Sequence, residues 1–402
     1  MKFLQVIASA DPGYGGPIEG VNRLGSAFAA LGHSQEVLTL DLGHEPFVTG
    51  SPWPVHALGR PPLPGRGAPV RLLNFLRGAP RAVAWLKQSA DRFDGVIVNG
   101  LWNYATRVAR LGLEQARVPA IVFTHGMLGP YDVLHYPLKH RAKTLLWHVN
   151  EGVLMHRAAA VAFTCEAERR LAGQAFDLSG MRQEVVGFGT DEPPAADPAQ
   201  RTAFLAQVPA LGDRRYFLYL GRLHEKKGCA ILIESFARIA ADWPDIDLVM
   251  AGPGDDASRD RFIRLAAQAG IAARIHWPGM VSGAAKWAAL YGCEAMTLPS
   301  HHENFGLAVV EALACGRPVV ISDQVNIYPE VVEGGGGLAG PDTVDGTEAS
   351  LRAFLGLPAA ARAAMGESGR RLFAERFDMR RTAQRLADLF AAAVQRRTGD
   401  IG

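Results

Sequence analysis

The sequence lacks any apolar run approaching the ~18–20 residues that a membrane-spanning helix needs. Residues 1–10 contain a short apolar stretch interrupted by Gln5, so we expect a buried strand there and not a secretory signal peptide. Only four cysteines occur in 402 residues, and none forms a Cys-x-x-Cys pair. This scarcity excludes zinc-ribbon and thioredoxin-type motifs and favours a cytoplasmic protein with reduced thiols.

The sequence also has almost no excess of either positive or negative charge. The 42 basic and 40 acidic residues leave a formal net charge of +2, too little to predict a nucleic-acid partner. The balance is uneven, because residues 1–190 contain 19 basic and 14 acidic residues (+5), whereas the remainder contains 23 and 26 (−3). We therefore expect the N-terminal half to face an anionic surface or acceptor.

Short apolar runs alternate with stretches of helical periodicity along the whole chain. We expect buried strands at residues 3–8, 36–40, 96–98, 120–123, 216–220, 247–250, 295–298 and 318–321. Such alternation predicts an α/β fold, with parallel sheets covered by helices on both faces. Three prolines in residues 191–198 indicate a linker, so the predicted domains are residues 1–190 and 199–379. The proline-rich segment 51–69 and the glycine run 334–337 are expected to be loops.

Two glutamates, Glu303 and Glu311, lie eight positions apart at the start of an apolar helical pattern. Phe305, Gly306 and Leu307 are predicted in the first turn of that helix, where unpaired backbone N–H groups favour an anion. Carboxylates beside a helix N-terminus suit a ligand with both hydroxyls and phosphates. The alternative is that Glu303 caps the helix and Glu311 is a solvated surface charge.

The residues around these glutamates follow the pattern P-S-x-x-E-x-F-G-L-x-x-x-E-A-x-A-x-G-x-P-V. This pattern resembles the E-x7-E signature of retaining GT-B glycosyltransferases of family 4. Three more segments resemble family elements in the same order: G-R-L-x-x-x-K-G at 221–228, A-G-x-G at 251–254 and the nucleotide-base segment at 279–281. Two segments depart from the family pattern: T-C-E-A-E at 164–168 replaces T-S-E-A-E, and 187–191 replaces N-G-V-D.

The resemblance implies two Rossmann-like domains facing each other across a cleft, with a final helix near residues 380–402 completing the first domain. It implies transfer of a hexose from a nucleotide sugar with retention at the anomeric carbon and without a metal. Glu303 and His125 would be catalytic, Glu311 would bind the ribose, and Val281 would lie near the base. Phe305, Gly306 and Leu307 would bind the donor through the helix N-terminus.

Arg222 and Lys227 follow a predicted strand and are five residues apart. Negative charge grows on a departing nucleoside diphosphate, and an Arg fork with a Lys point charge can hold it. We therefore expect both cations to bind the donor diphosphate. The alternative is a surface ion pair with Glu225 or Glu234.

A glycine loop containing Gly15 and Gly16 separates the first predicted strand from its helix. The resemblance implies that this loop closes over the donor phosphates. The alternative is a dinucleotide site, with Asp41 as the ribose-binding acid. The G-x-G-x-x-G fingerprint of such sites fails, because Ile18 occupies the third glycine position.

His125 follows the predicted strand 120–123, at the edge where open α/β sheets bind ligands. It resembles the family histidine that touches the donor sugar, and the alternative is a packed, hydrogen-bonded histidine. Two basic segments with apolar stripes, 71–87 and 137–149, contain Trp85 and Trp147. They indicate either peripheral membrane contact or ordinary helices packed on the sheet.

Together these features predict a hexosyltransferase that uses a GDP- or UDP-sugar and a glycan or lipid-linked acceptor, at the inner face of the membrane. Surface polysaccharide or glycolipid synthesis would be its setting. Two other classes stay open: a soluble synthase that glycosylates a small metabolite, and a non-catalytic nucleotide-sugar binder. The sequence does not name the sugar or the acceptor.

Overall fold

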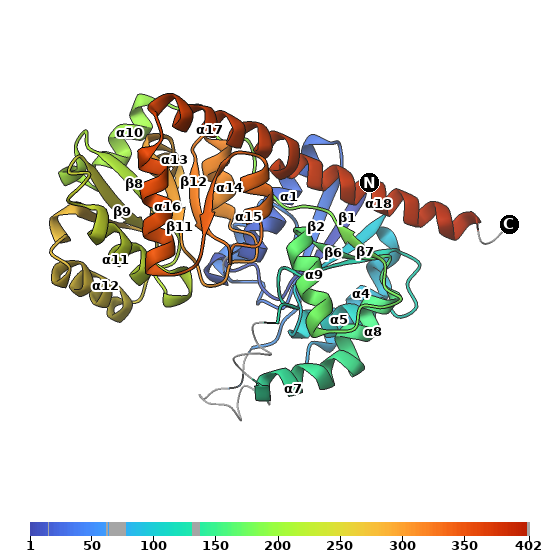
Figure 1. The fold of residues 1–402 in the computed structure, drawn as a ribbon. Coiled ribbons are helices and arrows are strands. Elements are labelled where there is room, and N and C mark those ends of the chain that lie inside the picture. Colours follow the sequence, from blue (N-terminus) through green and yellow to red (C-terminus); the bar gives the residue numbers. More distant parts are fainter. Residues whose placement is uncertain (15, 62, 64–77, 131–136, 400–402) are drawn as a thin grey trace. The chain divides into compact units, whose positions relative to one another are not determined.

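The computed structural model describes residues 1–14, 16–61, 63, 78–130 and 137–399 (Figure 1). The chain divides into two compact units. Unit 1 comprises Met1–Asp191 and Met379–Gly402, and unit 2 comprises Glu192–Asp378.

Unit 1 is built on a seven-stranded parallel sheet with the strand order β3-β2-β1-β4-β5-β6-β7. Its strands are β1 (Lys2–Val6), β2 (Ser34–Thr39), β3 (Val55–Ala57), β4 (Gly95–Asn99), β5 (Ala120–Phe123), β6 (Ala160–Phe163) and β7 (Gln183–Val185). Its helices are α1 (Gly16–Ala30), α2 (Pro46–Thr49), α4 (Pro80–Ser89), α5 (Tyr104–Gly112), α7 (Pro137–Leu146), α8 (Gly152–Arg157), α9 (Glu166–Ala175) and α18 (Met379–Gly399). Short turns of helix lie at η1 (Pro12–Tyr14), η2 (Ala90–Arg92) and η3 (Trp147–Glu151).

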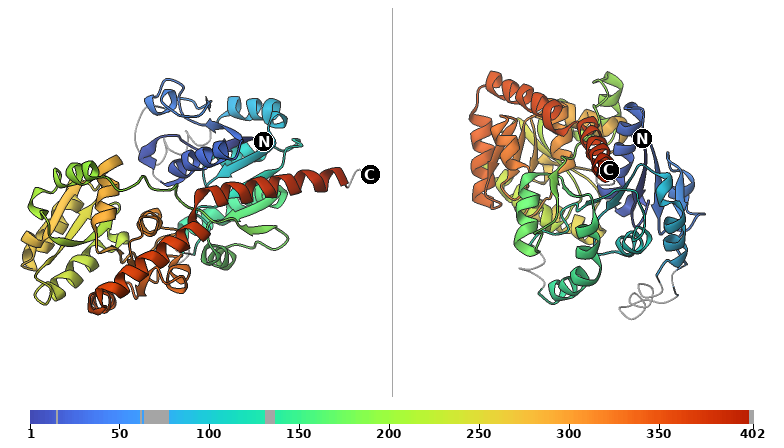
Figure 2. Two further views of the ribbon diagram at one scale, coloured as in Figure 1. Left: turned by 90° about the horizontal axis from the view of Figure 1, so that it is seen from above. Right: turned by 90° about the vertical axis from the view of Figure 1, so that its right-hand side faces the viewer.

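The last helix, α18, belongs to unit 1, where it packs beside α1 (Figure 1 and Figure 2). Phe390 of α18 is fully buried, with its ring centroid 5.2 Å from that of Phe3. A Cβ atom on Gly95 would lie 2.5 Å from the Phe390 ring, so only glycine leaves room for it there. Burial of this large aromatic side chain fastens α18 to the sheet.

Unit 2 is built on a six-stranded parallel sheet with the order β10-β9-β8-β11-β12-β13. Its strands are β8 (Arg215–Leu220), β9 (Ile246–Ala251), β10 (Ile275–Gly279), β11 (Ala295–Leu298), β12 (Val319–Ser322) and β13 (Gly337–Gly340). Its helices are α10 (Pro198–Leu205), α11 (Cys229–Ile239), α12 (Asp256–Gln268), α13 (Gly283–Gly292), α14 (Leu307–Ala314), α15 (Tyr328–Glu333), α16 (Val344–Gly356) and α17 (Ala359–Leu372). Short turns lie at η4 (Pro209–Leu211), η5 (Glu225–Lys227), η6 (Ala272–Arg274) and η7 (Phe373–Phe377).

These two parallel sheets with flanking helices confirm the predicted α/β class, and every predicted strand exists within two residues of its predicted ends. Two expected loops are wrong in part. The short edge strand β3 lies inside the proline-rich segment, and β13 begins at the last glycine of the 334–337 run. Gly337 is needed for that pairing, because a Cβ atom on it would lie 2.2 Å from the Val319 carbonyl oxygen.

Besides β3, four strands were not predicted: β6, β7, β10 and the β13 just described. β7 is only three residues long, β10 contains Pro278 and Gly279, and β13 has a glycine at each end. None of these has the run of β-branched and aromatic residues that marks a strand in sequence. They form because a neighbouring strand offers its backbone hydrogen-bonding groups.

Candidate functional site

The strand order of unit 2 reverses between β8 and β11, which are neighbours although two strands separate them in the chain. Open α/β sheets bind ligands beyond the carboxyl ends of their strands at such a point. The loop after β8, residues 221–228, contains Arg222 and Lys227. The loop after β11, residues 299–306, contains Glu303. The fold therefore brings the two predicted donor loops together at the reversal point.

The loops after β8, β9 and β10 are joined by backbone hydrogen bonds. The Leu223 amide donates to the Pro253 carbonyl at 2.7 Å, and the Gly252 amide donates to Gly279 at 2.7 Å. Gly252 has a φ of +143°, and a Cβ atom there would lie 1.9 Å from the Gly221 carbonyl oxygen. A side chain would separate these loops, so glycine is required for them to pack edge to edge.

Lys227 and Glu303 form an ion pair between the loops after β8 and β11, with their side chains 21% and 19% exposed. Lys227 therefore pairs with neither Glu225 nor Glu234. Glu225 pairs instead with Arg261. The pairing joins a residue predicted to bind the donor diphosphate, Lys227, to a residue predicted to be catalytic, Glu303.

The turn that contains Lys227 is fixed against the loop after β11. The Lys226 carbonyl accepts hydrogen bonds from the Ser300 hydroxyl at 2.8 Å and from the His301 amide at 2.9 Å. Gly228 has a φ of +70°, and a Cβ atom on it would lie 1.9 Å from the Pro299 carbonyl oxygen. The ion pair is thus held in place by backbone contacts on both sides.

Arg222 is exposed at the start of the loop after β8. The Arg222 carbonyl accepts a hydrogen bond from the hydroxyl of the buried Tyr219 at 2.7 Å. This bond fixes the Arg222 backbone, while the Arg222 side chain remains exposed to solvent. In the described part of the chain, its guanidinium has no hydrogen-bond or ion-pair partner. An unpaired Arg fork at this edge can bind a phosphate group.

Helix α14 begins at Leu307, after Gly306 in the left-handed conformation (φ +82°) with no side-chain cap. Glu303 is therefore not the helix cap. Of the three residues expected in the first turn, only Leu307 is in the helix, since Gly306 directly precedes it. Phe305 also lies before the helix. Its side chain is buried, with its ring edge-on to Phe377 at 5.7 Å. The first amides of α14 have no acceptor within the helix, because the preceding turn is absent.

Glu311 lies on α14, and its side chain is only 6% exposed, so the solvated-charge alternative is wrong. One of its carboxylate oxygens accepts a hydrogen bond from Lys286 Nζ on α13 at 2.9 Å. Sequence reasoning did not single out Lys286. The two residues are 25 positions apart on different helices, and no local spacing indicates the pair.

Val281 follows β10, and its side chain is buried. A ligand beside this segment would therefore meet its backbone more readily than its side chain. The neighbouring Met280 is 70% exposed, a large apolar surface that sequence reasoning did not single out.

In unit 1, Gly15 lies outside the described residues. Gly16 is the exposed first residue of α1, and a Cβ atom on it would meet no atom of the chain within 4 Å. Asp41 is used within the protein, since its carboxylate accepts a hydrogen bond from the Ala10 amide at 2.7 Å. This contact fixes the loop after β1 and gives Asp41 a role other than binding a dinucleotide.

His125 directly follows Thr124 beyond β5 and has an unusual positive φ of +48°. Its ring stacks on Phe123 with centroids 4.6 Å apart and lies edge-on to Phe188 at 5.8 Å. Desolvation lowers the pKa of His125 to about 4, so the imidazole is neutral at pH 7. The ring is packed and hydrogen-bonded, which agrees with the alternative interpretation of a structural histidine. His125 is nevertheless only partly buried, and it lies at the edge of the sheet where ligands bind.

Glu168 holds the His125 loop in place and was assigned no role from sequence. Its buried carboxylate accepts hydrogen bonds from the Thr124 hydroxyl at 2.5 Å and from the Gly126 amide at 2.6 Å. Its other oxygen accepts from the Thr164 amide at 2.8 Å. The sulfur of Cys165 caps α9, accepting from the Glu168 amide, so cysteine performs the capping that serine would.

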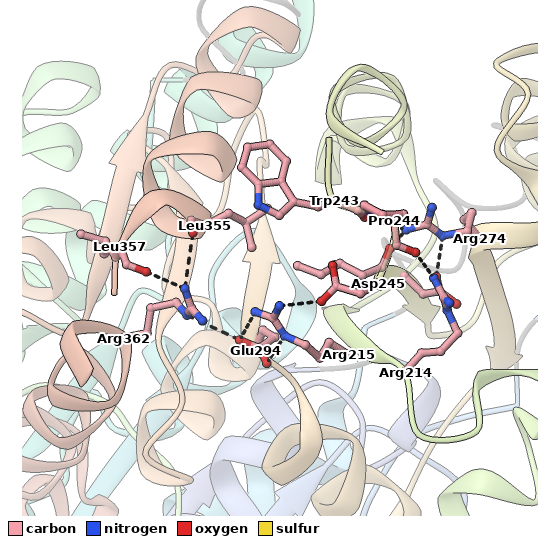
Figure 3. Close-up of polar contacts among 12 residues, drawn as sticks. Arg214, Arg215, Trp243, Pro244, Asp245, Arg274, Glu294, Leu355, Leu357 and Arg362 are labelled. Carbon is pink, nitrogen blue, oxygen red and sulfur yellow. Dashed lines mark hydrogen bonds and ion pairs between the residues drawn. The ribbon is translucent and has the colours of Figure 1, made fainter. Parts of the chain in front are cut away.

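A second group of charged residues lies at the N-terminal ends of the unit 2 strands, which we call the amino edge of the sheet (Figure 3). The opposite edge, at the C-terminal ends of the strands, is the carboxyl edge. Arg215 donates to both Glu294 oxygens, at 2.8 and 3.0 Å, and to Asp245 at 2.7 Å. Asp245 and Asp247 form an Asp-x-Asp tripeptide, a spacing that could hold a cation. Asp247 is engaged by Arg274 at 2.6 Å, and by Arg214 and His276.

Across the described residues, no group of three or more His, Cys, Asp or Glu side chains is arranged to hold a metal ion. No helix in the same part of the chain has the length and apolar character to cross a membrane.

Each of the two units matches a known protein family. The family described as "Glycosyl transferase 4-like domain" matches residues 15–189, and "Glycosyl transferases group 1" matches residues 200–372. The chain is 28% identical to D-inositol 3-phosphate glycosyltransferase of Stackebrandtia nassauensis over 338 residues, which is 82% of this chain and 74% of that protein.

It is also 33% identical to phosphatidyl-myo-inositol mannosyltransferase of Mycolicibacterium smegmatis over 249 residues, which is 56% of this chain and 63% of that protein. Among solved structures, that of Anabaena HepE in complex with UDP and glucose is similar, with a TM-score of 0.76 at 20% identity. The alignment covers 98% of this chain and 100% of HepE, which establishes the shared GT-B fold. Both halves of the sequence and the fold thus agree, and the chain is a hexosyltransferase that belongs to family 4 of the GT-B glycosyltransferases.

Proposed function

We propose that the protein transfers a hexose from a nucleotide sugar to a glycan or lipid-linked acceptor, with retention at the anomeric carbon. The observation that carries this proposal is that the loop with Arg222 and Lys227 packs against the loop that leads into α14, at the strand-reversal point of unit 2. Two cations and a helix N-terminus at one edge suit a diphosphate. The HepE structure, which contains UDP and glucose, supports a uridine diphosphate sugar as the first donor to test.

Each site residue has a proposed part in this reaction. Arg222 and Lys227 hold the diphosphate as the glycosidic bond breaks, which neutralises the charge without requiring a metal. The amides of Gly306 and Leu307 bind the same group, and Glu311 accepts hydrogen bonds from the ribose hydroxyls. Bound phosphate would compete with Glu303 for Lys227 and so release the Glu303 carboxylate toward the sugar.

The remaining predicted residues act through their backbone or from unit 1. The backbone at Val281 and Phe305 borders the nucleotide. Gly15 and Gly16 are proposed to bind the donor, and His125 is proposed to contact the sugar. This set of charged groups argues against a non-catalytic binder, because a diphosphate leaving group is what they best neutralise.

A thermal-shift screen tests the donor. A ligand present at 100 times its dissociation constant stabilises the folded protein by ~2.7 kcal/mol, which raises the melting temperature measurably. We expect a shift with a UDP- or GDP-sugar, and loss of that shift in Arg222→Ala. No shift with any nucleotide sugar, together with no transfer activity, would contradict the proposal.

A lipid-linked acceptor is supported by an exposed basic and apolar surface on α7 and η3. Leu145 is 67% exposed and Val149 is 54% exposed, and Arg141 beside them is exposed. The tryptophans contribute less than the sequence suggested. Trp147 is buried against Phe176, and the Trp85 ring packs against His56 with their centroids 4.2 Å apart. Residues 71–77 of the second basic segment lie outside the described residues.

Liposome flotation tests this surface. Each basic residue near an anionic bilayer adds ~1 kcal/mol, an attraction that salt weakens. We expect the protein to float with anionic liposomes at low salt, and Arg141→Glu/Leu145→Ser to float less. Arg264→Glu, on exposed α12, is the matched control and should float like the wild type. Absence of flotation at low salt would exclude peripheral membrane contact.

A small acceptor is the second candidate, supported by the similarity to D-inositol 3-phosphate glycosyltransferase. The transfer assay separates the two candidates once the donor is known. Product formed on an inositol phosphate in the absence of lipid would favour the small-metabolite synthase. Transfer only to a lipid-linked or glycan acceptor would exclude it.

A further inference from the structure

Three buried amide side chains connect His125 to the interior of unit 1. Asn99, Gln5 and Gln35, which we call the amide relay, are 4%, 0% and 3% exposed. They lie on β4, β1 and β2, and His125 follows β5, so the relay crosses adjacent strands in the order of the sheet. Buried amides on three successive strands are costly to place unless each is hydrogen-bonded.

Every link in the relay is hydrogen-bonded. Gln35 Nε2 lies 3.0 Å from the Val21 carbonyl oxygen, and Gln5 Nε2 lies 3.1 Å from Gln35 Oε1. Asn99 Nδ2 lies 2.8 Å from Gln5 Oε1, and His125 Nε2 lies 3.1 Å from Asn99 Oδ1.

The Val21 carbonyl fixes the direction of all these bonds, because a carbonyl oxygen only accepts. Gln35 must present its NH₂ group to Val21 and its oxygen to Gln5. The same requirement passes through Gln5 to Asn99, whose oxygen therefore faces His125. His125 Nε2 must then carry a hydrogen and donate it.

This direction determines what the other ring nitrogen of His125 can do. Because burial keeps the pKa of His125 at about 4, the ring holds a single hydrogen at neutral pH, and the relay places it on Nε2. Nδ1 then has a lone pair and can only accept a hydrogen bond. Among the described residues, Nδ1 has no partner. Glu168 fixes the flanking Thr124 and Gly126, so the loop itself is already held.

We propose that the amide relay holds His125 as the Nε2–H tautomer, so that Nδ1 accepts a hydrogen bond from a hydroxyl group of the sugar substrate. The proposal rests on the proposed function for the identity of that hydroxyl, whereas the tautomer is a property of the free protein. Phosphate and carboxylate oxygens are rejected by the same atom, since neither donates a hydrogen. Gln35, Gln5 and Asn99 are positioning residues in this scheme, because they act through His125.

The first test is an NMR spectrum of the substrate-free protein with ¹⁵N-labelled histidine. Long-range ¹H–¹⁵N correlations distinguish the two neutral tautomers, and comparison with His125→Gln identifies the signals of His125. We expect a protonated Nε2 and an unprotonated Nδ1 at pH 7. A proton on Nδ1 would overturn the proposal without any need for a variant or an activity assay.

The second test uses two substitutions at Gln5 that both break its hydrogen bond to Gln35. Gln5→Glu keeps a carboxyl oxygen that accepts from Asn99, so the Asn99 orientation and the His125 tautomer should persist. Gln5→Met removes that acceptor and leaves the Asn99 NH₂ group only the Ile97 carbonyl oxygen, 3.5 Å away, so the Asn99 amide can turn over and donate to His125. We expect a mixture of tautomers and kcat/KM about tenfold below that of Gln5→Glu, the loss of one hydrogen bond.

The two variants separate positioning from stability. If the relay only satisfied buried polar groups, both variants would be less stable, with equal kcat/KM and an unchanged tautomer, which would overturn the proposal. If Gln5→Met does not fold, the wild-type spectrum still decides. If the wild type transfers no sugar although the tautomer is as expected, the proposed function fails and the relay stands.

Discussion

The two edges of the unit 2 sheet both contain arginines, but these arginines have different partners. At the amino edge, Arg215 is shared between Glu294 and Asp245 (Figure 3). At the carboxyl edge, Arg222 is exposed and has no side-chain partner in the described residues. At the amino edge, Arg215 is already paired with carboxylates of the protein. The carboxyl edge keeps a cation available where parallel sheets bind ligands.

The comparison shows that a cluster of arginines does not by itself indicate a binding site. Arg214 and Arg274 both form ion pairs with the buried Asp247, and Arg362 Nε lies 3.6 Å from Glu294 Oε2. The arginines of the amino edge therefore stabilise the fold. Both edges contain arginines, and they differ in whether those arginines have carboxylate partners. Substitutions at the carboxyl edge should therefore lower activity, whereas substitutions at the amino edge should lower stability.

At the carboxyl edge, Arg222→Ala should lower turnover by about 10²–10³-fold, because deletion of a charge-stabilising donor has this effect in other enzymes. The circular dichroism spectrum should stay native, since the Arg222 side chain is exposed. Steady-state kinetics against Arg264→Ala, an exposed arginine on α12, provides the control. Wild-type turnover in Arg222→Ala would remove the residue from the site.

Glu311→Gln should weaken donor binding by ~1.5–3 kcal/mol, the contribution of a hydrogen bond to a charged acceptor. The substitution keeps the side-chain shape and an oxygen for Lys286 to bond, so folding should be little affected. Isothermal titration calorimetry with the donor identified in the screen measures the loss. Donor affinity equal to that of the wild type would mean that Glu311 serves only as the partner of Lys286.

At the amino edge, Arg215→Met should lower the free energy of unfolding by ~1 kcal/mol, since its pairs are partly exposed, and should leave kcat and KM unchanged. Hydrogen bonding from Arg215 lowers the pKa of Glu294 below its ordinary value of 4.5. A lowered folded-state pKa gives stability that is present above pH 4.5 and lost as the pH falls through the folded value. The stability difference between wild type and variant should therefore shrink in acid.

Urea unfolding at a series of pH values from 7 down to 3 measures that difference. A difference that stays constant with pH would show that Arg215 acts through packing and not through charge. A change in kcat would connect the amino edge to catalysis and remove the contrast between the edges.

Activity should persist in excess EDTA, because Arg222 and Lys227 supply the positive charge that the departing diphosphate needs. The expected effect is no change in initial rate, measured with and without EDTA at constant ionic strength. Loss of activity that manganese restores would show that these cations are insufficient.

Much of the fold could be predicted because its signals are local. The strands at residues 120–123 and 295–298 have the predicted ends, since each is a short apolar run bounded by polar or glycine-containing segments. β3 and β7 could not be predicted, because strands of three residues depend on the neighbouring strand for their hydrogen bonds. Edge strands of this kind have too few residues to show a pattern.

The candidate site was predicted less completely. The spacing of Glu303 and Glu311 could be found in the sequence, but their cationic partners could not. Lys227 is 76 positions from Glu303, and Lys286 is 25 positions from Glu311. Glu168 and Asn99 were missed because their roles depend on contacts between different strands and loops.

The amino-acid sequence alone was enough to predict most of the strands, the chemistry of each loop and the resemblance to one enzyme family. These depend on residue type and short-range spacing, which the chain carries in any conformation. The tertiary structure decided which charges pair, which glutamate is buried and which ring nitrogen of His125 bears its hydrogen. Those outcomes require distant strands to become neighbours, since ion pairs and hydrogen bonds act only over a few ångströms.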